Sequence, residues 1–355
     1  MLSLNCTAAK NPLFRGDKVP RPIFRPNRIL YLTSVWVLLV LLVGVSFPLK
    51  TQSQPAPGFR WLNDDEASTA DLYFNKQMVL RYEYAFDDST KESTHETYKV
   101  FHHVFGPVSG DRLTKGPGGK YTHHRGMMVG WNKTQFEGKS LDFWHCSKGA
   151  HLKHIQFIEQ SGDAESGRMK AEIHWNDAEG NPVIVEERSV SARIASGSDK
   201  ANPEWEITWQ SKLASRRGEI ILDGDRQHSG FQFRAAQSVA EGNSARYTRP
   251  SGFPRPSEAF EVKDRKNPTA HCDLGWFAMS FPVKGSTYTV AYFADPKAPK
   301  PLRFSERPYG RFGTFFNTRL TPEVPLEMKY RLIITKGIPD RVDILNRYIQ
   351  FHREQ

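Results

Sequence analysis

Cysteine is scarce in this 355-residue chain, which has only three, and just one apolar run is long enough to cross a bilayer. The first shortage excludes a small disulfide-stapled protein, and the second excludes a polytopic membrane protein. A G-x-S-x-G elbow, a Walker phosphate loop and a G-x-G-x-x-G motif after a strand are also absent, which disfavours nucleotide-dependent catalysis. The length allows one large domain or two ordinary ones.

The net charge of +10 is concentrated at the N-terminus, where residues 1–28 carry six basic side chains and one acid and so contribute +5. Residues 29–47 then contain no charge and approach the about 20 residues that span a bilayer. The positive-inside rule predicts a cytoplasmic tail over 1–28, a transmembrane anchor over 29–47 and a periplasmic or extracellular remainder. Cleavage as a signal peptide, with secretion, is the alternative. This topology accounts for the charge better than nucleic-acid binding does.

Residues 48–60, rich in proline, glycine, serine and glutamine, are typical of a linker, so we expect an exported domain over 61–355. Apolar and polar residues alternate in five segments of this domain, which predicts strands. These segments are residues 170–175, 205–209, 231–234, 287–293 and 326–332. The residues 177–182 predict a turn, and Trp205 and Trp209 are expected in the core.

One good helix is expected, over residues 340–351, with Asp340 as its cap and Val342, Leu345 and Ile349 on its apolar face. The predicted fold is therefore all-β, a large antiparallel β-sandwich with a concave sheet face and one C-terminal helix. Two cysteines, Cys146 and Cys272, fall in the exported domain and are expected either to pair or to remain buried thiols.

The densest chemical feature is a loop, Gly116-Pro117-Gly118-Gly119, that delivers His123, His124 and Arg125. In an extended chain His123 and His124 point to opposite faces, so a metal site would combine one of them with His145, His154 or a distant residue. The spacing matches no zinc motif, and we predict no resident metal or cofactor. Bound metal, acid/base or substrate contact, and structural hydrogen bonding all remain open as roles of these histidines.

Indole rings beside the histidines suit sugar faces, arginine forks suit acidic groups, and a carboxylate suits a partner base. These considerations select the candidate residues. The predicted catalytic residues are His124, His145 and Glu187, and the predicted substrate-binding residues are His123, Arg125, Trp131, Asp142, Trp144, His228, Arg234 and Arg307.

Several of these residues fall in segments that carry a family resemblance. The segments are Thr122-His123-His124-Arg125-Gly126, Gly130-Trp131, Asp142-Phe143-Trp144, Trp175-Asn176-Asp177, Gly230-Phe231-Gln232-Phe233-Arg234 and Arg307-Pro308-Tyr309-Gly310. Over residues 75–350 the chain resembles a bacterial family of unknown function, DUF6807, also labelled methane oxygenase PmoA-like. Its members often carry Asp-His-Pro before the histidine pair, where this chain has Lys120-Tyr121-Thr122.

The resemblance implies an architecture similar to the galactose-mutarotase-like supersandwiches, many of which handle carbohydrates. Three functions follow as expectations. The first is a membrane-tethered protein that binds or transforms a saccharide or another small molecule in a cleft lined by His, Arg and Trp. The second is a non-catalytic binding or structural module of the cell envelope. The third, which the family label implies, is a metal-dependent oxygenase.

Overall fold

Strands dominate the folded part of the chain, as the alternation predicted. The computed structural model describes residues 57–198, 201–225, 227–251 and 272–355. By its internal contacts the chain divides after Ser53, and all described residues belong to the second part. The predicted tail and the segment 29–47 lie outside the described residues. Within the described ranges, no helix is both long and apolar enough to span a membrane.

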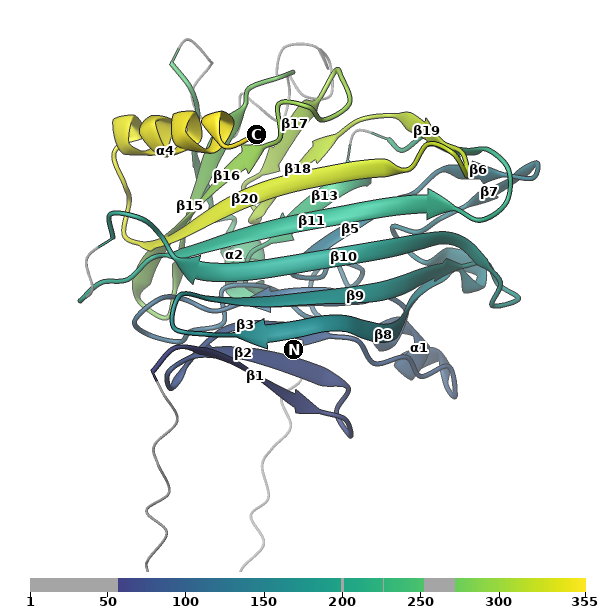
Figure 1. The fold of residues 1–355 in the computed structure, drawn as a ribbon, viewed down its shortest axis with the longest axis horizontal. Helices are drawn as coiled ribbons and strands as arrows, with labels where there is room; N and C mark the ends of the chain where they lie inside the picture. The colour runs from purple at the N-terminus through teal and green to yellow at the C-terminus, as the bar shows by residue number, and fades with distance from the viewer. Residues whose placement is uncertain (1–56, 199–200, 226, 252–271) are drawn as a thin grey trace, which may run out of the picture. The chain divides into compact units, whose positions relative to one another are not determined.

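The first large sheet has eight antiparallel strands, and β5 and β13 lie side by side near its middle (Figure 1). In spatial order its strands are β1 (Phe59–Asp64), β2 (Thr69–Phe74), β3 (Gln77–Glu83), β4 (Phe101–Val104), β5 (Met127–Trp131), β13 (Ser229–Arg234), β18 (Arg311–Phe315) and β17 (Arg303–Arg307). Strand β1 therefore begins inside the predicted linker.

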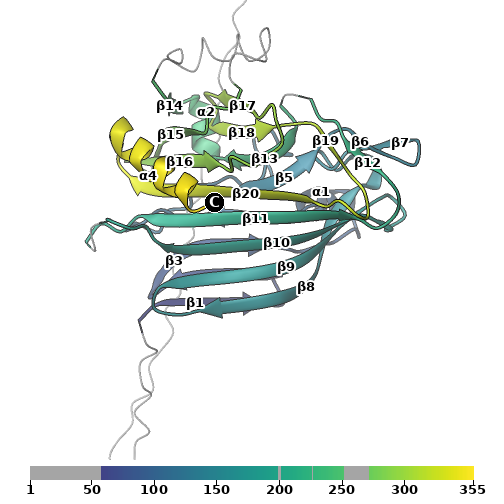
Figure 2. The same cartoon turned by 45° about the horizontal axis from the view of Figure 1, so that its top comes forward.

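The second large sheet also has eight strands, and Figure 2 shows its long strands running side by side across the molecule. They are β14 (Arg246–Thr248), β15 (Trp276–Val283), β16 (Ser286–Ala294), β20 (Leu326–Lys336), β11 (Trp205–Ser215), β10 (Pro182–Ile194), β9 (Ser166–Asn176) and β8 (His151–Gly162). A small sheet contains β19 (Thr318–Leu320), β12 (Ile220–Leu222), β6 (Thr134–Phe136) and β7 (Lys139–Leu141). All five predicted strand segments are confirmed.

The inner faces of the two large sheets pack against each other through aromatic side chains. The ring of Phe231 on β13 lies 5.3 Å from Trp209 on β11 and 4.7 Å from Tyr330 on β20, centroid to centroid. Trp205 and Trp209 are completely buried, which confirms their place in the core. Each such ring stabilises the fold by about 1.5–3 kcal/mol through removal of apolar area from water. The fold is thus a β-sandwich.

Helices are few, and the described ones are α1 (Lys91–Thr97), α2 (Gln237–Gly242), α4 (Arg341–Arg353) and the 3₁₀ turn η1 (Ser147–Gly149). The helix predicted at the C-terminus is confirmed as α4, and the Asp340 carboxylate accepts a hydrogen bond from the Val342 N–H at 2.8 Å.

The predicted apolar face of α4 is wrong. Val342, Leu345 and Ile349 are exposed, whereas Ile344 and Phe351 are buried. These two side chains join a cluster with Trp276, Phe293 and Ile333 of the second sheet. The outer face of that sheet thus selects the helix face that it buries, and local spacing does not reveal which face that is.

The two cysteines of the folded part are not joined by a disulfide bond. Cys146 lies in the loop after β7, and its thiol lies 3.9 Å from the Phe143 carbonyl. Burial raises the pKa of Cys146 to about 11, so the thiol stays protonated. Of the alternatives for these residues, the structure therefore shows unlinked thiols.

A buried ion pair ties three neighbouring strands of the second sheet together on its inner face. Glu186 on β10 accepts hydrogen bonds from Arg188 Nε at 2.8 Å, Trp175 Nε1 at 2.9 Å and Ser211 Oγ at 2.5 Å. The side chains of Glu186 and Arg188 are completely buried. Its neighbour Glu187 points to the outer face, as strand alternation requires.

We expect Glu186→Gln to lower the free energy of unfolding by about 3–5 kcal/mol, because it leaves the buried Arg188 without its counter-charge. Denaturant unfolding followed by tryptophan fluorescence measures the loss. Glu187→Gln is the matched control on the adjacent residue. Its exposed pair with Lys170 predicts a change within about 0.5 kcal/mol. Equal losses in the two variants would contradict the role given to the buried pair.

Candidate metal centre

Two distant segments are tied to the end of β5. The N–H of Phe143, in the loop 142–146, donates to the Trp131 carbonyl at 2.9 Å, and the N–H of Asn132 donates to the His228 carbonyl at 2.9 Å. The loop 142–146 and the turn before β13 are therefore held next to each other. The glycine-rich loop before β5, predicted from the sequence, supplies the third segment.

Three histidines meet where these segments converge. The ring centroids of His123 and His145 are 4.7 Å apart, those of His145 and His228 are 4.9 Å apart, and those of His123 and His228 are 6.3 Å apart. One potential ligand atom from each residue lies within 4.8 Å of the other two. A Zn²⁺ ion bound at 2.0–2.1 Å needs nitrogens about 3.3 Å apart, so these atoms would move closer together around a bound ion. All three residues are partly exposed, so a ligand from solvent can reach them.

The ring of His145 is oriented by Asp142, three residues earlier. Its Nδ1 lies 2.8 Å from Asp142 Oδ2, and a carboxylate only accepts, so Nδ1 carries the hydrogen. The other oxygen, Oδ1, accepts the N–H groups of Trp144 at 2.9 Å and His145 at 2.7 Å. Three hydrogen bonds thus fix the carboxylate, and the carboxylate fixes the ring.

The ring of His228 is oriented in the same way by Asp225. Its Nδ1 lies 2.8 Å and 2.9 Å from the two carboxylate oxygens. Asp225 also accepts from the side-chain amide of Asn132 and from the N–H of Gln227, both at 2.8 Å. The motif Asp-x-x-His therefore occurs twice with one geometry.

These contacts leave one nitrogen of each ring available. With Nδ1 used by an aspartate, His145 and His228 each retain Nε2 as an acceptor. His123 Nε2 is buried and has no hydrogen-bond partner. Metal-binding histidines characteristically donate their other N–H to a carboxylate in this way.

The electrostatics keep two of the rings neutral and the aspartates ionised. Burial, with Arg234 and the neighbouring histidines, lowers the pKa of His123 to about 2. Burial also lowers the pKa of His228, although Asp225 opposes it. Burial disfavours the charged form of Asp142 and Asp225, but hydrogen bonds from their histidines and from backbone N–H groups lower both pKa values. Neutral imidazole is the form that binds metal.

Positive groups lie close to the three histidines. The Arg234 guanidinium carbon is 5.8 Å from the centroid of Trp144, whose ring edge packs 5.6 Å from His228. The buried Lys99 amine donates to the Trp144 carbonyl. Burial opposes ionisation of Tyr309, but Arg311, Arg234 and Arg307 together lower its pKa.

His124 packs edge-on against His123, with ring centroids 4.4 Å apart, and belongs to an aromatic stack on its other side. Its ring centroid lies 4.9 Å from Tyr121 and 5.8 Å from Tyr309, and both pairs are nearly parallel. The residue is buried, and burial together with Arg234 holds its pKa far below the usual range. His123 belongs to the group of three potential ligands, and His124 does not.

The tryptophans assigned to a cleft wall are core residues instead. Trp131 and Trp144 are completely buried, so neither indole offers a face to a sugar. Trp131 donates to the Phe316 carbonyl at 3.2 Å and packs against Trp175. The sequence does not reveal this, because the residues around a tryptophan do not show whether its indole ring will be buried between the sheets or exposed.

Two predicted arginines are structural. Arg125 is completely buried and donates to the carbonyls of His124 at 3.1 Å and His95 at 2.6 Å. Arg307, also buried, donates to the Glu306 carbonyl at 2.6 Å and to Ser305 Oγ at 3.2 Å. Both guanidinium groups thus bind oxygen atoms of the protein itself, and their predicted role in substrate binding stays a prediction.

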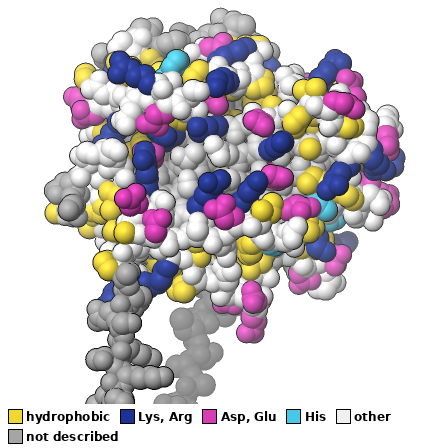
Figure 3. All heavy atoms as spheres, viewed as in Figure 1, with side chains coloured by type: hydrophobic (Ala, Val, Ile, Leu, Met, Phe, Trp, Pro, Cys, Tyr) yellow, Lys and Arg dark blue, Asp and Glu magenta, His cyan; other side chains and the backbone are white. Residues whose placement is uncertain are grey.

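The predicted base Glu187 is also misplaced. It is bonded to Lys170 at 2.6 Å on the outer face of the second sheet, where acidic and basic side chains alternate over the surface (Figure 3). It therefore cannot act with His124 or His145, which belong to segments of the first sheet. His154, named as a possible metal partner, packs against Tyr82 and Tyr84 instead.

The sequence contained a usable signal for one residue that was missed. Asp142-Phe143-Trp144-His145 and Asp225-Arg226-Gln227-His228 share the Asp-x-x-His spacing, which would have assigned Asp225 beside Asp142. No comparable signal marks Lys99 or Tyr309, because their proximity to the histidines comes from the fold.

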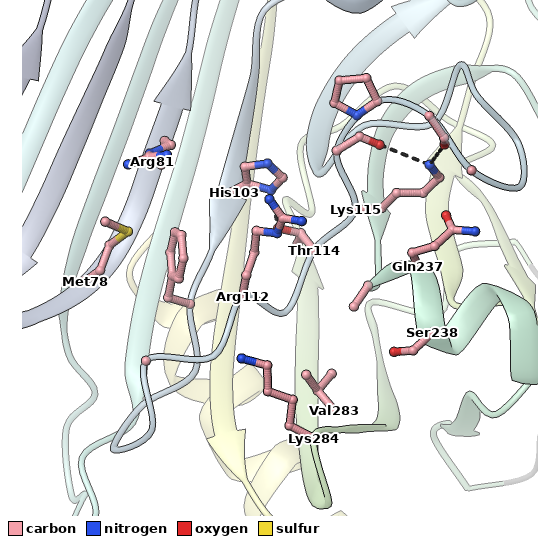
Figure 4. Close-up of a pocket in the computed structure, with 17 residues that line it drawn as sticks. Met78, Arg81, His103, Arg112, Thr114, Lys115, Gln237, Ser238, Val283 and Lys284 are labelled. Carbon is pink, nitrogen blue, oxygen red and sulfur yellow. Dashed lines mark hydrogen bonds between the residues drawn. The ribbon is translucent and has the colours of Figure 1, made fainter. Parts of the chain in front are cut away.

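A separate pocket of about 630 Å³ opens beside the glycine-rich loop (Figure 4). It is lined by basic residues including Arg81, Arg112, Lys115 and Lys284, and by none of the three clustered histidines. Arg81 and Lys284 are paired with aspartates, and Lys115 donates to backbone carbonyls of its own loop. Its cations are thus largely satisfied, which makes the histidine cluster the better candidate.

Comparison with known proteins gives a family but no activity. A family model, described as a family of unknown function and designated DUF6807, matches residues 69–348. No curated protein matches the chain.

Two solved structures show weak similarity. A protein assigned as a kojibiose phosphorylase from the human microbiome has 11% identity and a TM-score of 0.28, over 83% of this chain and 32% of its own. Galactose 1-epimerase from Lactobacillus acidophilus NCFM has 8% identity and a TM-score of 0.32, over 79% of this chain and 99% of its own. This chain thus spans about a third of the first protein's length. With TM-scores this low, neither structure informs the function.

A glycine on β5 controls the position of the loop that carries His145. A Cβ added to Gly130 would lie 2.5 Å from the Phe143 carbonyl oxygen. We expect Gly130→Ala to displace the loop and lower the free energy of unfolding by about 1–3 kcal/mol, measured by thermal or denaturant unfolding. Gly116→Ala is the control, because its added Cβ meets only ordinary contacts of 3.5 Å. A Gly130→Ala protein as stable as this control would show that the close approach is unimportant.

Proposed function

Since the chain belongs to DUF6807, a family of unknown function, we propose its function from the site itself. In this proposal the protein is a metal-dependent enzyme in which His123, His145 and His228 bind one divalent transition-metal ion. The observation that carries the proposal is the pair of Asp-supported rings facing a third imidazole whose buried Nε2 has no partner. Histidines that only tie loops together have no reason to converge on one point.

The donor set selects the class of metal. Three neutral imidazole nitrogens suit Zn²⁺, Fe²⁺, Co²⁺, Ni²⁺ or Cu²⁺, whereas Mg²⁺ and Ca²⁺ prefer oxygen ligands. Three protein ligands with a solvent-facing side are typical of catalytic sites, because structural zinc sites are closed by a fourth protein ligand. The partial exposure of His145 and His228, at 33% and 27%, fits an open site.

The bound ion, the two aspartates and Trp144 would have different roles in such a site. A bound ion acts as a Lewis acid on a substrate oxygen or lowers the pKa of a bound water. Asp142 and Asp225 fix the histidine tautomers and raise the basicity of the rings. The buried ring of Trp144 closes the space behind His228 and excludes water from that side.

A saccharide substrate is not part of the proposal. That expectation rested in part on Trp131 and Trp144 as stacking surfaces, and both are buried. The methane-oxygenase label likewise has no support, because the matching family has no assigned activity. A purely structural role for the histidines is the competing function, and metal binding separates the two.

We expect the full-length protein to bind one equivalent of Zn²⁺ or Co²⁺ after removal of endogenous metal. His123→Ala, His145→Ala and His228→Ala should each weaken this binding at least 100-fold, because each removes one of three ligands. Isothermal titration and elemental analysis of the same samples measure affinity and stoichiometry.

His174→Ala is the matched control, because His174 also contacts a carboxylate, Glu172, at 2.7 Å, but stands apart from the three histidines. It should bind metal as the unmodified protein does. The absence of stoichiometric binding of any of the five metals would end the proposal in favour of a structural role.

The aspartates give a second, graded prediction. Asp142→Asn and Asp225→Asn should weaken metal binding about 10- to 100-fold, because the ring orientation and basicity that they supply are lost while all three ligands remain. The same titrations measure this. Affinities equal to those of the unmodified protein would show that the hydrogen bonds do not support a metal centre.

A further inference from the structure

Arg234, the last residue of β13, is a buried cation without an evident counter-charge. It is 2% exposed, its guanidinium is hydrogen-bonded to the side chain of Tyr309, and its Nε and Nη1 have no hydrogen-bond partner. The ionisable groups that act on it most strongly are Arg311, Tyr309 and Tyr247, and none of them is a carboxylate. The buried Arg188 differs, since it is paired with Glu186.

The guanidinium lies in the same wall as the three histidines. It sits 5.8 Å from the ring of Trp144, and that ring packs against His228. The N–H of Arg234 also donates to the Gly126 carbonyl at 3.0 Å, close in the chain to His123. Its charge acts on both His123 and His124, which places it within electrostatic range of the cluster.

An unpaired buried charge destabilises a fold, so its presence calls for compensation from a bound group. The aspartates of the cluster do not supply it, because both are already bonded to histidines and backbone N–H groups. A planar carboxylate matches a guanidinium in shape and charge. Arg311, Arg234 and Arg307 also lower the pKa of Tyr309, so the positive charge around Tyr309 favours an anionic ligand as well.

We propose that the substrate is a small organic acid, whose carboxylate pairs with Arg234 while another of its oxygen atoms binds at the histidine-held metal. This inference rests on the metal centre proposed above. It assigns Arg234 a substrate-binding role, as the sequence suggested. The proposed substrate class thus changes from small molecules in general to anions that carry a carboxylate and a second oxygen-containing group.

Dicarboxylates of increasing length are suitable probes, and acetate, which has a single carboxylate, is the reference. In the Co²⁺-loaded full-length protein, the visible spectrum and isothermal titration report binding of acetate, oxalate, malonate, succinate and glutarate. We expect at least one dicarboxylate to bind tenfold or more tightly than acetate. Arg234→Gln should abolish that advantage while leaving metal content unchanged, and Arg234→Lys should retain part of it.

The melting temperature distinguishes a loss of ligand binding from misfolding of the variant. Because no carboxylate is among the groups that act on Arg234, Arg234→Gln should leave the melting temperature of the ligand-free protein unchanged or raised. Arg331→Gln is the matched control, since this buried arginine pairs with Glu206 and Glu354 and its loss should lower the melting temperature.

The outcomes separate the two proposals. Normal Co²⁺ binding with equal dicarboxylate affinities in the unmodified protein and Arg234→Gln would overturn the acid-binding inference and leave the metal centre standing. A protein that binds no metal would overturn the metal centre itself.

Discussion

The hydrogen bonds from two histidines to two aspartates are the interactions on which the candidate site depends. Each leaves the far nitrogen of its ring directed away from the carboxylate, and each carboxylate is in turn held by N–H groups of its own loop. Backbone hydrogen bonds join the loop 142–146 and the turn before β13 to the end of β5, so the first sheet sets the orientation of the His145 and His228 rings. The site is therefore as rigid as the central strands of the sandwich, which is what a metal centre requires.

Charge balance gives the site its chemical character. Both aspartates are committed to histidines, while Lys99, Arg234 and Arg311 lie nearby in buried positions. A site with ionised carboxylates free to bind would favour cations such as Ca²⁺, whereas neutral imidazoles among guanidinium groups favour a transition metal and an anionic ligand. The same balance explains why the separate basic pocket is less informative, since aspartates already pair with two of its cations.

The sandwich positions the site through its aromatic core. Both indoles once expected at a cleft wall are buried against strands of the two sheets, where they support the loops from behind. Their role is thus to hold the histidines in place. The transmembrane segment predicted over residues 29–47 lies outside the described residues. This segment and the export of the folded part stay predictions.

Local patterns in the sequence were sufficient for five of the strands, the turn at 177–182, the C-terminal helix and the loop that delivers His123, because alternation, turn residues and caps act over a few neighbouring residues. The Asp-x-x-His spacing is local too and would have added Asp225 to the predicted residues Asp142, His145 and His228. Which side chains meet was decided only by tertiary structure. Pairing of β5 with β13 brings His228 to residues about a hundred positions earlier. Strand alternation allowed only one of Glu186 and Glu187 to face inward, but the packing of the two sheets decided that it is Glu186.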